Sequence, residues 1–366
     1  MSSDSPNWPA WLPLRSTLTG LTPYGAPQIS EVLSLNTNEN PFELPAPVVQ
    51  AMMQKLPAVL ARLNRYPDRD AVALRTKLSS YINSLSHTNF DRNNIWAANG
   101  SNEILQTLML ALGERGAIGF LPSYSVHPLI AQVTGTQWSA GKRNPDFTLD
   151  INSAIAEINQ AKPGLIFITT PNNPTGTSLA ISDIARLAQA ATEISAMLII
   201  DEAYAEFSSE ISAVTLIEKY PNVVVVRTMS KAFAFAGARV GYLIARPEVI
   251  DACLITRLPY HLSSTTQAIA EIALEHSSEL MAEVQLLISE RERVTRALQI
   301  LGLSVVPSAA NFLLFTGFTQ SAGELWKSLV EEGILIRDVG IAGHLRVTIG
   351  TPEENQRFLK AINKLK

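Results

Sequence analysis

Two side chains stand out for chemistry because each one follows a short apolar run. Lys231 comes shortly after the run VVVV, and Asp201 directly follows MLII. A lysine at the end of a buried strand is partly desolvated, which lowers its pKa and makes its amine a nucleophile. A buried carboxylate needs a partner, for which a metal ion is one candidate. The alternative for Lys231 is a side chain that lies along the protein and reaches solvent.

Ser101 and Arg239 are candidate ligands for an anion. Ser101 follows Asn99-Gly100 at the start of an expected helix, and Arg239 lies eight positions after Lys231. Free backbone N–H groups and the positive dipole end of a helix can hold a phosphate, and a guanidinium binds phosphate through two hydrogen bonds. An ordinary N-cap at Ser101 is the simpler alternative.

Asn173 lies in the loop TPNNPTG, which directly follows the apolar run LIFIT. Two prolines and a glycine fix the loop, so that the amide can be aimed at a ligand. Because asparagine, proline and glycine are also the usual turn residues, a structural turn is a serious alternative.

The elements that must position these residues form an alternating pattern of short apolar runs and helical stretches. Continuously apolar strands between helices predict an α/β fold with a mostly parallel sheet that is covered on both faces. Ligands of such sheets bind at the carboxyl ends of the strands. The expected strands are 117–121, 165–169, 197–200, 223–226 and 240–244, and the expected helices between them are 151–159, 181–194 and 214–219.

The remaining segments do not show this alternation of strands and helices. Residues 1–45 are rich in proline, asparagine, serine and threonine and predict an extended arm. Helices are expected at 48–63, at 71–85 and from Ser101 onward, and 262–301 predicts one or two long helices that leave the sheet domain. The tail, from about 303 to 366, predicts a small α+β domain with apolar runs at 311–315, 334–337 and 345–349.

Composition excludes several classes of protein. The chain has 366 residues, 46% of them hydrophobic, which allows a large and a smaller domain with sizeable cores. A net charge of -4 gives no general attraction to nucleic acid or anionic membranes. One cysteine, Cys253, excludes an intrachain disulfide, and no apolar run approaches the length of a membrane span. We therefore expect a cytoplasmic protein without nucleic-acid, membrane or metal partners.

The order Asp201-x-x-Tyr204, Ser230-Lys231 and Arg239 resembles the pyridoxal-phosphate aminotransferases of the aspartate aminotransferase type. The stretches LNTNENP, RYPD, PSYS and LRVTIG are similar to those of the superfamily's histidinol-phosphate aminotransferase branch, so the resemblance extends along nearly the whole chain. It implies a large domain (46–265) with a seven-stranded sheet, a small domain (266–366), and an arm (1–45) that packs with the small domain and with a dimer partner.

The resemblance also implies roles at a pyridoxal 5′-phosphate cofactor. Lys231 would bind the cofactor covalently and later carry a proton, while Asp201 would keep the pyridine nitrogen protonated. Tyr204 and Asn173 would hydrogen-bond the 3′-oxygen, and Tyr124 would stack on the ring. The phosphate ligands would be backbone N–H groups of Ser101 and Asn102, the side chains of Thr228, Ser230 and Arg239, and Tyr66 of the neighbouring subunit in a homodimer. Relatives often carry an acid where this chain has Asn102.

On the substrate side, the resemblance implies that Arg346 binds a carboxylate. Arg337 is a plausible second anion ligand, and Tyr24 and Asn38 are further substrate-side residues; Tyr260 and His261 line the same cavity or merely pack. The implied reaction is transamination between histidinol phosphate and 2-oxoglutarate in histidine biosynthesis. An aromatic amino-acid aminotransferase is the nearest alternative, and a threonine-phosphate decarboxylase-like lyase is another.

Three more distant classes are disfavoured. A transcription regulator that reuses this domain would need a DNA-binding module longer and more basic than the arm. A dinucleotide-binding Rossmann domain would need Gly-x-Gly-x-x-Gly after an early strand, and a P-loop hydrolase would need Gly-x-x-x-x-Gly-Lys-Ser/Thr. Neither motif occurs in the chain.

Overall fold

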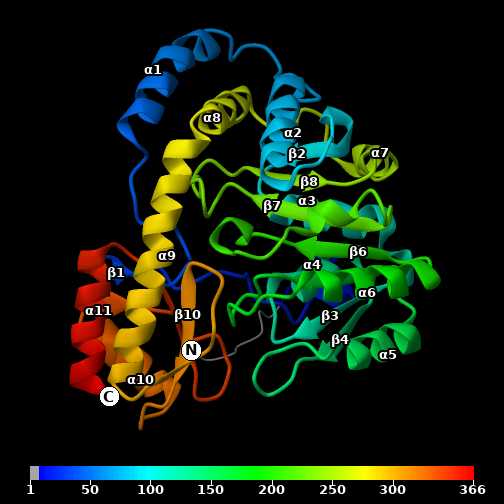
Figure 1. Ribbon diagram of the computed structural model, residues 1–366. Helices are drawn as coiled ribbons and strands as arrows, with labels where there is room; N and C mark the ends of the chain where they lie inside the picture. The colour runs from blue at the N-terminus through cyan, green and yellow to red at the C-terminus, as the bar shows by residue number, and fades with distance from the viewer. Residues whose placement is uncertain (1–7) are drawn as a thin grey trace.

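The computed structural model describes residues 8–366, so the first seven residues of the expected arm lie outside the described part of the chain. Its centre is a seven-stranded sheet in the order β2-β8-β7-β6-β5-β3-β4 (Figure 1). β8 runs antiparallel to both neighbours, and the other pairs are parallel. The strands are β2 (Ile95–Ala98), β3 (Ala117–Leu121), β4 (Trp138–Lys142), β5 (Leu165–Thr169), β6 (Met197–Asp201), β7 (Val223–Thr228) and β8 (Gly241–Ile244).

Helices cover both faces of this sheet because successive strand residues point to opposite sides. Leu165 and Phe167 of β5 pack with one cluster of helices, whereas Ile166 and Ile168 pack with the other. The first cluster contains α3 (Ser101–Leu112), α4 (Val126–Thr134) and α7 (Pro247–Thr256). The second contains α1 (Ala46–Leu60), α2 (Val72–Ser86), α5 (Ile151–Ala161), α6 (Ile181–Glu193) and α8 (Ser264–Glu275).

The long helix α9 (Ser277–Ile300) leads from this layer to a smaller sheet (Figure 1). That sheet is antiparallel, in the order β12-β10-β9, and a separate parallel pair joins β1 of the arm to β11. The arm is therefore attached to the small sheet through its own short strand. The elements are β1 (Leu33–Ser34), β9 (Ser304–Val305), β10 (Phe312–Thr316), α10 (Ala322–Glu331), β11 (Ile334–Leu335), β12 (Leu345–Thr348) and α11 (Pro352–Leu365).

The predicted fold class is confirmed, and the strands predicted at 117–121 and 165–169 match β3 and β5 residue for residue. The helix predicted at 214–219 is wrong, because Ala213–Leu216 forms a single 3-10 turn. Strands β2 and β4 were not expected. β4 has the sequence WSAGK on the sheet edge, where only Gly141 is buried, so no apolar run marks it.

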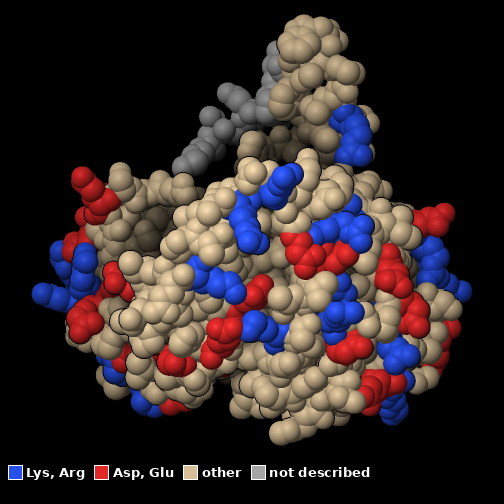
Figure 2. All heavy atoms as spheres, turned by 90° about the horizontal axis from the view of Figure 1, so that it is seen from above, with Lys and Arg blue, Asp and Glu red and all other residues tan. Residues whose placement is uncertain are grey.

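Among the described residues, no helix combines the length and the apolar character needed to cross a bilayer. On the face seen in Figure 2, basic and acidic side chains are interspersed over the body of the molecule. That face therefore carries no broad field of a single sign.

Candidate active site

A cavity of about 550 Å³ lies at the carboxyl ends of the central strands, between the large sheet, the small sheet and the arm. Both β6 and β7 end at its wall, with Asp201 and Thr228 as their last residues. It collects all but one of the predicted site residues from segments that are far apart in the sequence. These are Tyr24, Asn38, Ser101, Asn102, Tyr124, Asn173, Asp201, Tyr204, Thr228, Ser230, Lys231, Arg239, Arg337 and Arg346.

Lys231 projects its amine into this cavity, where Nζ donates a hydrogen bond to the carbonyl oxygen of Thr37 at 2.9 Å. Burial lowers the pKa of this amine to about 8, and the positive charges of Arg346 and Arg239 act in the same direction. The carboxylate of Glu39 opposes them. The amine therefore loses its proton more readily than that of an ordinary lysine, as a nucleophile requires.

Asp201 is buried and is held by a histidine that the sequence analysis did not single out. His127 Nε2 lies 3.1 Å from Asp201 Oδ2, and both side chains are almost completely inaccessible to solvent. Asp201 still lines the cavity. His127 thus orients the Asp201 carboxylate, and the part of Asp201 that lines the cavity is available to a cationic group of a ligand.

The neighbouring acid, Glu202, has a separate structural role. Arg227 donates to Glu202 Oε2 from both Nε (3.0 Å) and Nη2 (2.8 Å), and its Nη1 donates to Glu206 Oε1 at 3.3 Å. This buried group explains why a second acid follows the apolar strand. It lies outside the cavity lining, and no residues in the described part of the chain form a cluster suited to a metal ion.

Backbone N–H, hydroxyl and guanidinium groups that could hold an anion line one part of the cavity. We call them the anion-binding cradle and define it as Ser101, Asn102, Thr228, Ser230 and Arg239. Gly100 rather than Ser101 is the N-cap of α3, so the alternative of a Ser101 side-chain cap is wrong. The first N–H groups of the helix remain free for a ligand. Arg239 Nη1 donates to Ser230 Oγ at 3.3 Å and to the carbonyl oxygen of Ala236 at 3.1 Å, while Thr228 Oγ1 donates to Ser230 Oγ at 3.0 Å.

Two glycines make room for this cradle. A Cβ on Gly241 would collide with the backbone nitrogen of Ser101, and a Cβ on Gly100 would collide with the Arg239 guanidinium. Gly100 also has a φ of +83°, which favours glycine. Strand β8 and the start of α3 therefore approach as closely as their backbones allow, directly under the anion site.

Another part of the lining contains two arginines that could bind an anionic substrate. We call it the substrate wall and define it as Asn36–Glu39 of the arm together with Arg337 and Arg346. Arg346 is buried; its Nη1 donates to Asn173 Oδ1 at 2.5 Å and its Nη2 donates to the carbonyl oxygen of Asn36 at 2.8 Å. Its Nε is buried without a hydrogen-bond partner among the described residues. An unsatisfied buried donor is costly, so this guanidinium is ready to accept an anionic ligand.

Arg337 pairs with Arg346 through a backbone bridge, and its guanidinium makes no hydrogen bond or ion pair with any described residue. The two arginines therefore place two positive charges at one end of the cavity. Tyr24 and Tyr124 supply its aromatic surface, and the Tyr124 hydroxyl donates to Asn102 Oδ1 at 3.3 Å. Burial raises the pKa of Tyr124, which keeps its hydroxyl protonated.

Three aromatic residues that the sequence analysis considered lie outside this lining. Tyr66 is 80% exposed and stacks on Tyr260, with ring centroids 4.4 Å apart. His261 Nε2 contacts the carbonyl oxygen of Ala97 at 2.9 Å, so this histidine supports the fold. Tyr66 is thus the one predicted cofactor ligand that does not reach the cavity of its own chain.

The site also contains residues that sequence reasoning missed: His127, Thr37, Glu39 and Ser123. His127 lies three positions after Tyr124, at the start of α4. Its nearness in the sequence to a predicted site residue is the only signal that was available for it. Nothing in the sequence connects residues 36–39 to Lys231, because the contact joins positions 194 residues apart.

The arrangement fits pyridoxal phosphate. A lysine amine with a lowered pKa, a buried carboxylate and groups that could hold a phosphate converge on one cavity. These are the contacts that the aldehyde, the protonated ring nitrogen and the phosphate ester of this cofactor require.

Known proteins were compared with this chain in sequence and in structure. The family model for aminotransferase class I and II matches residues 30–362. The histidinol-phosphate aminotransferase of Nocardia farcinica is 53% identical over 95% of this chain and 90% of its own, and that of Mycobacterium marinum is 51% identical over 96% and 91%.

A solved structure, the histidinol-phosphate aminotransferase from Clostridium acetobutylicum, is similar with a TM-score of 0.82, at 24% identity over 91% of this chain and 98% of that one. The same enzyme from Sinorhizobium meliloti, solved in complex with pyridoxal-5′-phosphate, gives a TM-score of 0.81 at 23% identity, over 92% and 91%. These two likenesses establish the fold. With the family model matching most of its length, the chain belongs to the class I and II aminotransferases.

Proposed function

We propose that this chain is a pyridoxal-phosphate-dependent histidinol-phosphate aminotransferase, which exchanges an amino group between histidinol phosphate and 2-oxoglutarate. The observation that carries the proposal is the substrate wall, where Arg346 and the unpaired Arg337 present two cations to an anionic substrate. The named relatives at 51–53% identity support the same substrate.

Pyridoxal phosphate supplies an electron sink that stabilises a carbanion at the substrate carbon. The residues of this chain do the rest. Lys231 would hold the group covalently, and its amine, once released, would carry a proton to and from the reacting carbon. Asp201, oriented by His127, would keep the ring nitrogen protonated, and the cradle would hold the phosphate.

Arg346 and Arg337 explain how one site accepts two partners in turn. A guanidinium matches a carboxylate or a phosphate through two parallel hydrogen bonds, so the same end of the cavity suits the phosphate of one substrate and a carboxylate of the other. With an aromatic amino acid as substrate, the Arg337 charge would have no partner. The aromatic ring would need an apolar slot where the cavity has this charge. The aromatic aminotransferase is therefore the less well supported alternative.

The test is the amino-transfer half-reaction, followed by the visible absorbance of the cofactor as amino donors are added. We expect histidinol phosphate to convert the cofactor at a far higher kcat/KM than phenylalanine. A matched variant, Arg337→Gln, should lower kcat/KM for histidinol phosphate more than for glutamate. If phenylalanine is the better donor, the substrate proposal is wrong while the aminotransferase chemistry stands.

We also propose a homodimer in which Tyr66 reaches the phosphate of the neighbouring subunit's cofactor. Tyr66 is exposed next to Tyr260, and the nearby Ile255 and Leu258 are 84% and 74% exposed. Apolar side chains this exposed mark an interaction surface. A second copy of this chain fits that surface. Tyr66 does not reach the cavity of its own chain, so the cavity of each copy can receive Tyr66 from the other copy.

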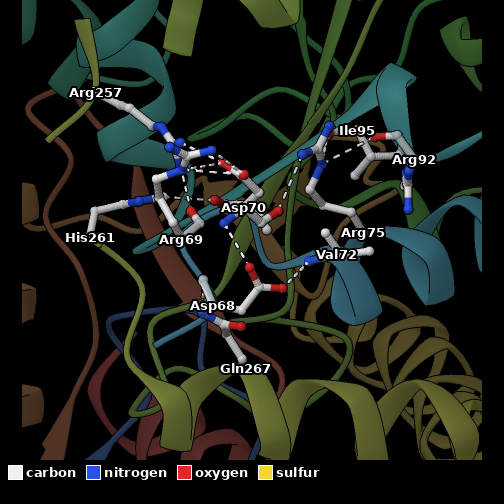
Figure 3. A network of polar contacts seen from close by, with 11 residues as sticks. Asp68, Arg69, Asp70, Val72, Arg75, Arg92, Ile95, Arg257, His261 and Gln267 are labelled. Atoms are coloured by element: carbon white, nitrogen blue, oxygen red, sulfur yellow. Dashed lines mark hydrogen bonds and ion pairs between the residues drawn. The ribbon is translucent and has the colours of Figure 1, made fainter. Parts of the chain in front are cut away.

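Polar contacts hold the segment that follows Tyr66, and Figure 3 shows those of Asp68 and Asp70. Asp68 accepts hydrogen bonds from the backbone of Val72, and Gln267 Nε2 donates to the Asp68 carbonyl oxygen at 2.9 Å. Asp70 is bonded by Arg69 and by Arg257, whose Nη2 lies 2.8 Å away. The hydrogen bonds from these guanidinium groups lower the pKa of Asp70 to about 2. An exposed tyrosine on such a fixed loop is preorganised for contact.

Mixing two inactive or impaired variants tests this geometry. Tyr66→Phe and Lys231→Ala chains should form hybrid dimers in which one site has both native residues and regains full turnover. If Tyr66 serves its own subunit, each hybrid site carries one defect and no activity is regained. The separate Tyr66→Phe homodimer provides the baseline.

The division into an arm (1–45), a large domain (46–265) and a small domain (266–366) is likewise our proposal. It is supported by β1 pairing with β11 and by α9 leading from one sheet to the other. A cytoplasmic location is proposed as well, in keeping with a lone buried thiol at Cys253.

A further inference from the structure

Asn38 belongs to the substrate wall, yet its side chain is committed to the protein. It is 1% exposed and has a φ of +56°, a left-handed conformation that asparagine tolerates better than most residues. Its Nδ2 lies 2.9 Å from the Tyr204 hydroxyl, and its Oδ1 lies 3.1 Å from Thr348 Oγ1. Both ends of the amide are therefore occupied.

The orientation of this amide follows from its partners. The backbone N–H of Asn38 donates to Thr348 Oγ1 at 3.0 Å, so the threonine hydroxyl accepts there and directs its own proton to Asn38 Oδ1. The NH₂ end of the amide must then face Tyr204.

Asn173 approaches the same phenol from another loop, and its orientation is fixed in the same way. Its Oδ1 accepts a hydrogen bond from Arg346 Nη1, and a guanidinium can only donate. The Asn173 Nδ2 therefore faces the Tyr204 hydroxyl, at 3.3 Å. The phenol ring is held between them by edge contact with Phe312, with ring centroids 5.1 Å apart.

Two N–H donors thus occupy both lone pairs of the Tyr204 oxygen, which leaves the phenol proton no acceptor among these partners. Tyr204 lines the cavity, so the open direction for that proton is toward the ligand. We propose that Asn38 is a positioning residue that, together with Asn173, makes the Tyr204 hydroxyl a dedicated hydrogen-bond donor to an anionic oxygen of the bound cofactor. In this role Asn38 acts through Tyr204.

The inference rests on the proposed function, which places pyridoxal phosphate with its ring oxygen beside Tyr204. A donor to that oxygen makes it less basic. The lysine-linked cofactor then loses its proton at a lower pH, and the midpoint of its visible absorbance titration reports the strength of the donor.

The test is the absorbance midpoint of the complete enzyme for Asn38→Asp, which keeps the size and backbone preference of asparagine but replaces the NH₂ donor by an acceptor. The phenol then donates to the new carboxylate instead of to the ligand. We expect the midpoint to rise by about one to two pH units, as for loss of one hydrogen bond to a charged oxygen. Asn38→Gly removes the donor without adding charge and should raise the midpoint by a smaller amount.

The decisive comparison is Asn38→Gly in a Tyr204→Phe background, where it should not shift the midpoint further. Asn311→Ala is the matched control, because Asn311 Nδ2 bonds only the backbone carbonyl of Asn38 and is equally buried. Its midpoint should equal that of the unmodified enzyme. A shift by Asn38→Gly that persists without the Tyr204 hydroxyl, or no shift in either Asn38 variant when Tyr204 is present, overturns the inference. Absence of any visible band in the unmodified enzyme would instead refute the proposed function.

Discussion

The anion-binding cradle and the substrate wall line one cavity, but their internal hydrogen bonds span very different sequence distances. In the cradle, the hydrogen bonds between Thr228, Ser230, Arg239 and Val240 join residues within 12 positions of one another. In the substrate wall, Asn38 bonds Thr348 and Arg346 bonds Asn36, each pair 310 positions apart. The side-chain part of the cradle is thus set by one strand-loop-strand unit, to which the start of α3 adds the backbone of Ser101 and Asn102. The wall exists only when the arm, the large sheet and the small sheet are assembled.

This contrast predicts that the two regions can be disabled separately, because the cradle would hold the cofactor and the wall would bind the substrate. Lys231 is influenced by both regions, since its amine bonds the carbonyl oxygen of Thr37, and burial together with the charges of Arg346 and Arg239 lowers its pKa.

The largest effect is expected for Lys231→Ala. Loss of the amine removes both the covalent attachment and the proton carrier, so kcat should fall by roughly 10⁴-fold or more. Far-ultraviolet circular dichroism should be unchanged, because the lysine makes a single hydrogen bond to the protein. Substantial remaining turnover would show that another group is the catalytic amine.

Arg239→Gln and Arg346→Gln separate the two regions. Each removes a charge-assisted contact worth about 10- to 100-fold in affinity. We expect Arg239→Gln to weaken binding of pyridoxal phosphate in equilibrium dialysis, and Arg346→Gln to raise KM for 2-oxoglutarate while cofactor affinity is kept. If both variants lose the cofactor equally, the division into cradle and wall is wrong.

A pair of glycines tests the close approach beneath the cradle. Gly241→Ala should weaken cofactor binding and lower the free energy of unfolding by about 1–3 kcal/mol, because the new methyl group collides with the Ser101 nitrogen. Gly237→Ala lies in the neighbouring loop, where a Cβ meets no atom within 4 Å, and should change neither quantity appreciably. Equal effects of the two variants in denaturant titrations and binding assays would contradict this account.

The smallest effect concerns pH. Because burial and two arginines lower the pKa of Lys231 to about 8, its reactive free amine increases as pH rises through 8. The rate of pyridoxal phosphate uptake by the cofactor-free chain should follow that curve. In Arg346→Gln the loss of a nearby positive charge raises the lysine pKa, so the midpoint should move upward. A midpoint near the ordinary lysine value in the unmodified chain would show that burial does not tune this amine.

The same contrast explains what could be predicted from the sequence. The buried strands β3, β5 and β7 are continuous apolar runs, and Asp201 and Lys231 follow such runs, so local sequence points to them. Strand β4 has no such run, because an edge strand buries little. The predicted start of a helix also differs from the observed one where capping depends on context: Gly100 rather than Ser101 caps α3.

The remainder of the site depends on contacts that no local pattern encodes. His127 reaches Asp201 across 74 positions, and Asn38 reaches Tyr204 across 166. Glu202 follows the same apolar run as Asp201 but pairs with Arg227, and only the fold shows which of the two acids faces the cavity. Composition predicted the arm, and resemblance to a family supplied its packing and the role of Arg346, whereas hydrogen-bond geometry shows how both are held.

The most direct test of the central claim is to reduce the purified, cofactor-loaded protein with borohydride and locate the cofactor by peptide mass spectrometry. We expect a single modified site at Lys231, and loss of the modification in the Lys231→Ala protein. Modification spread over surface lysines, or absent at Lys231 in protein that carries out transamination, would contradict it.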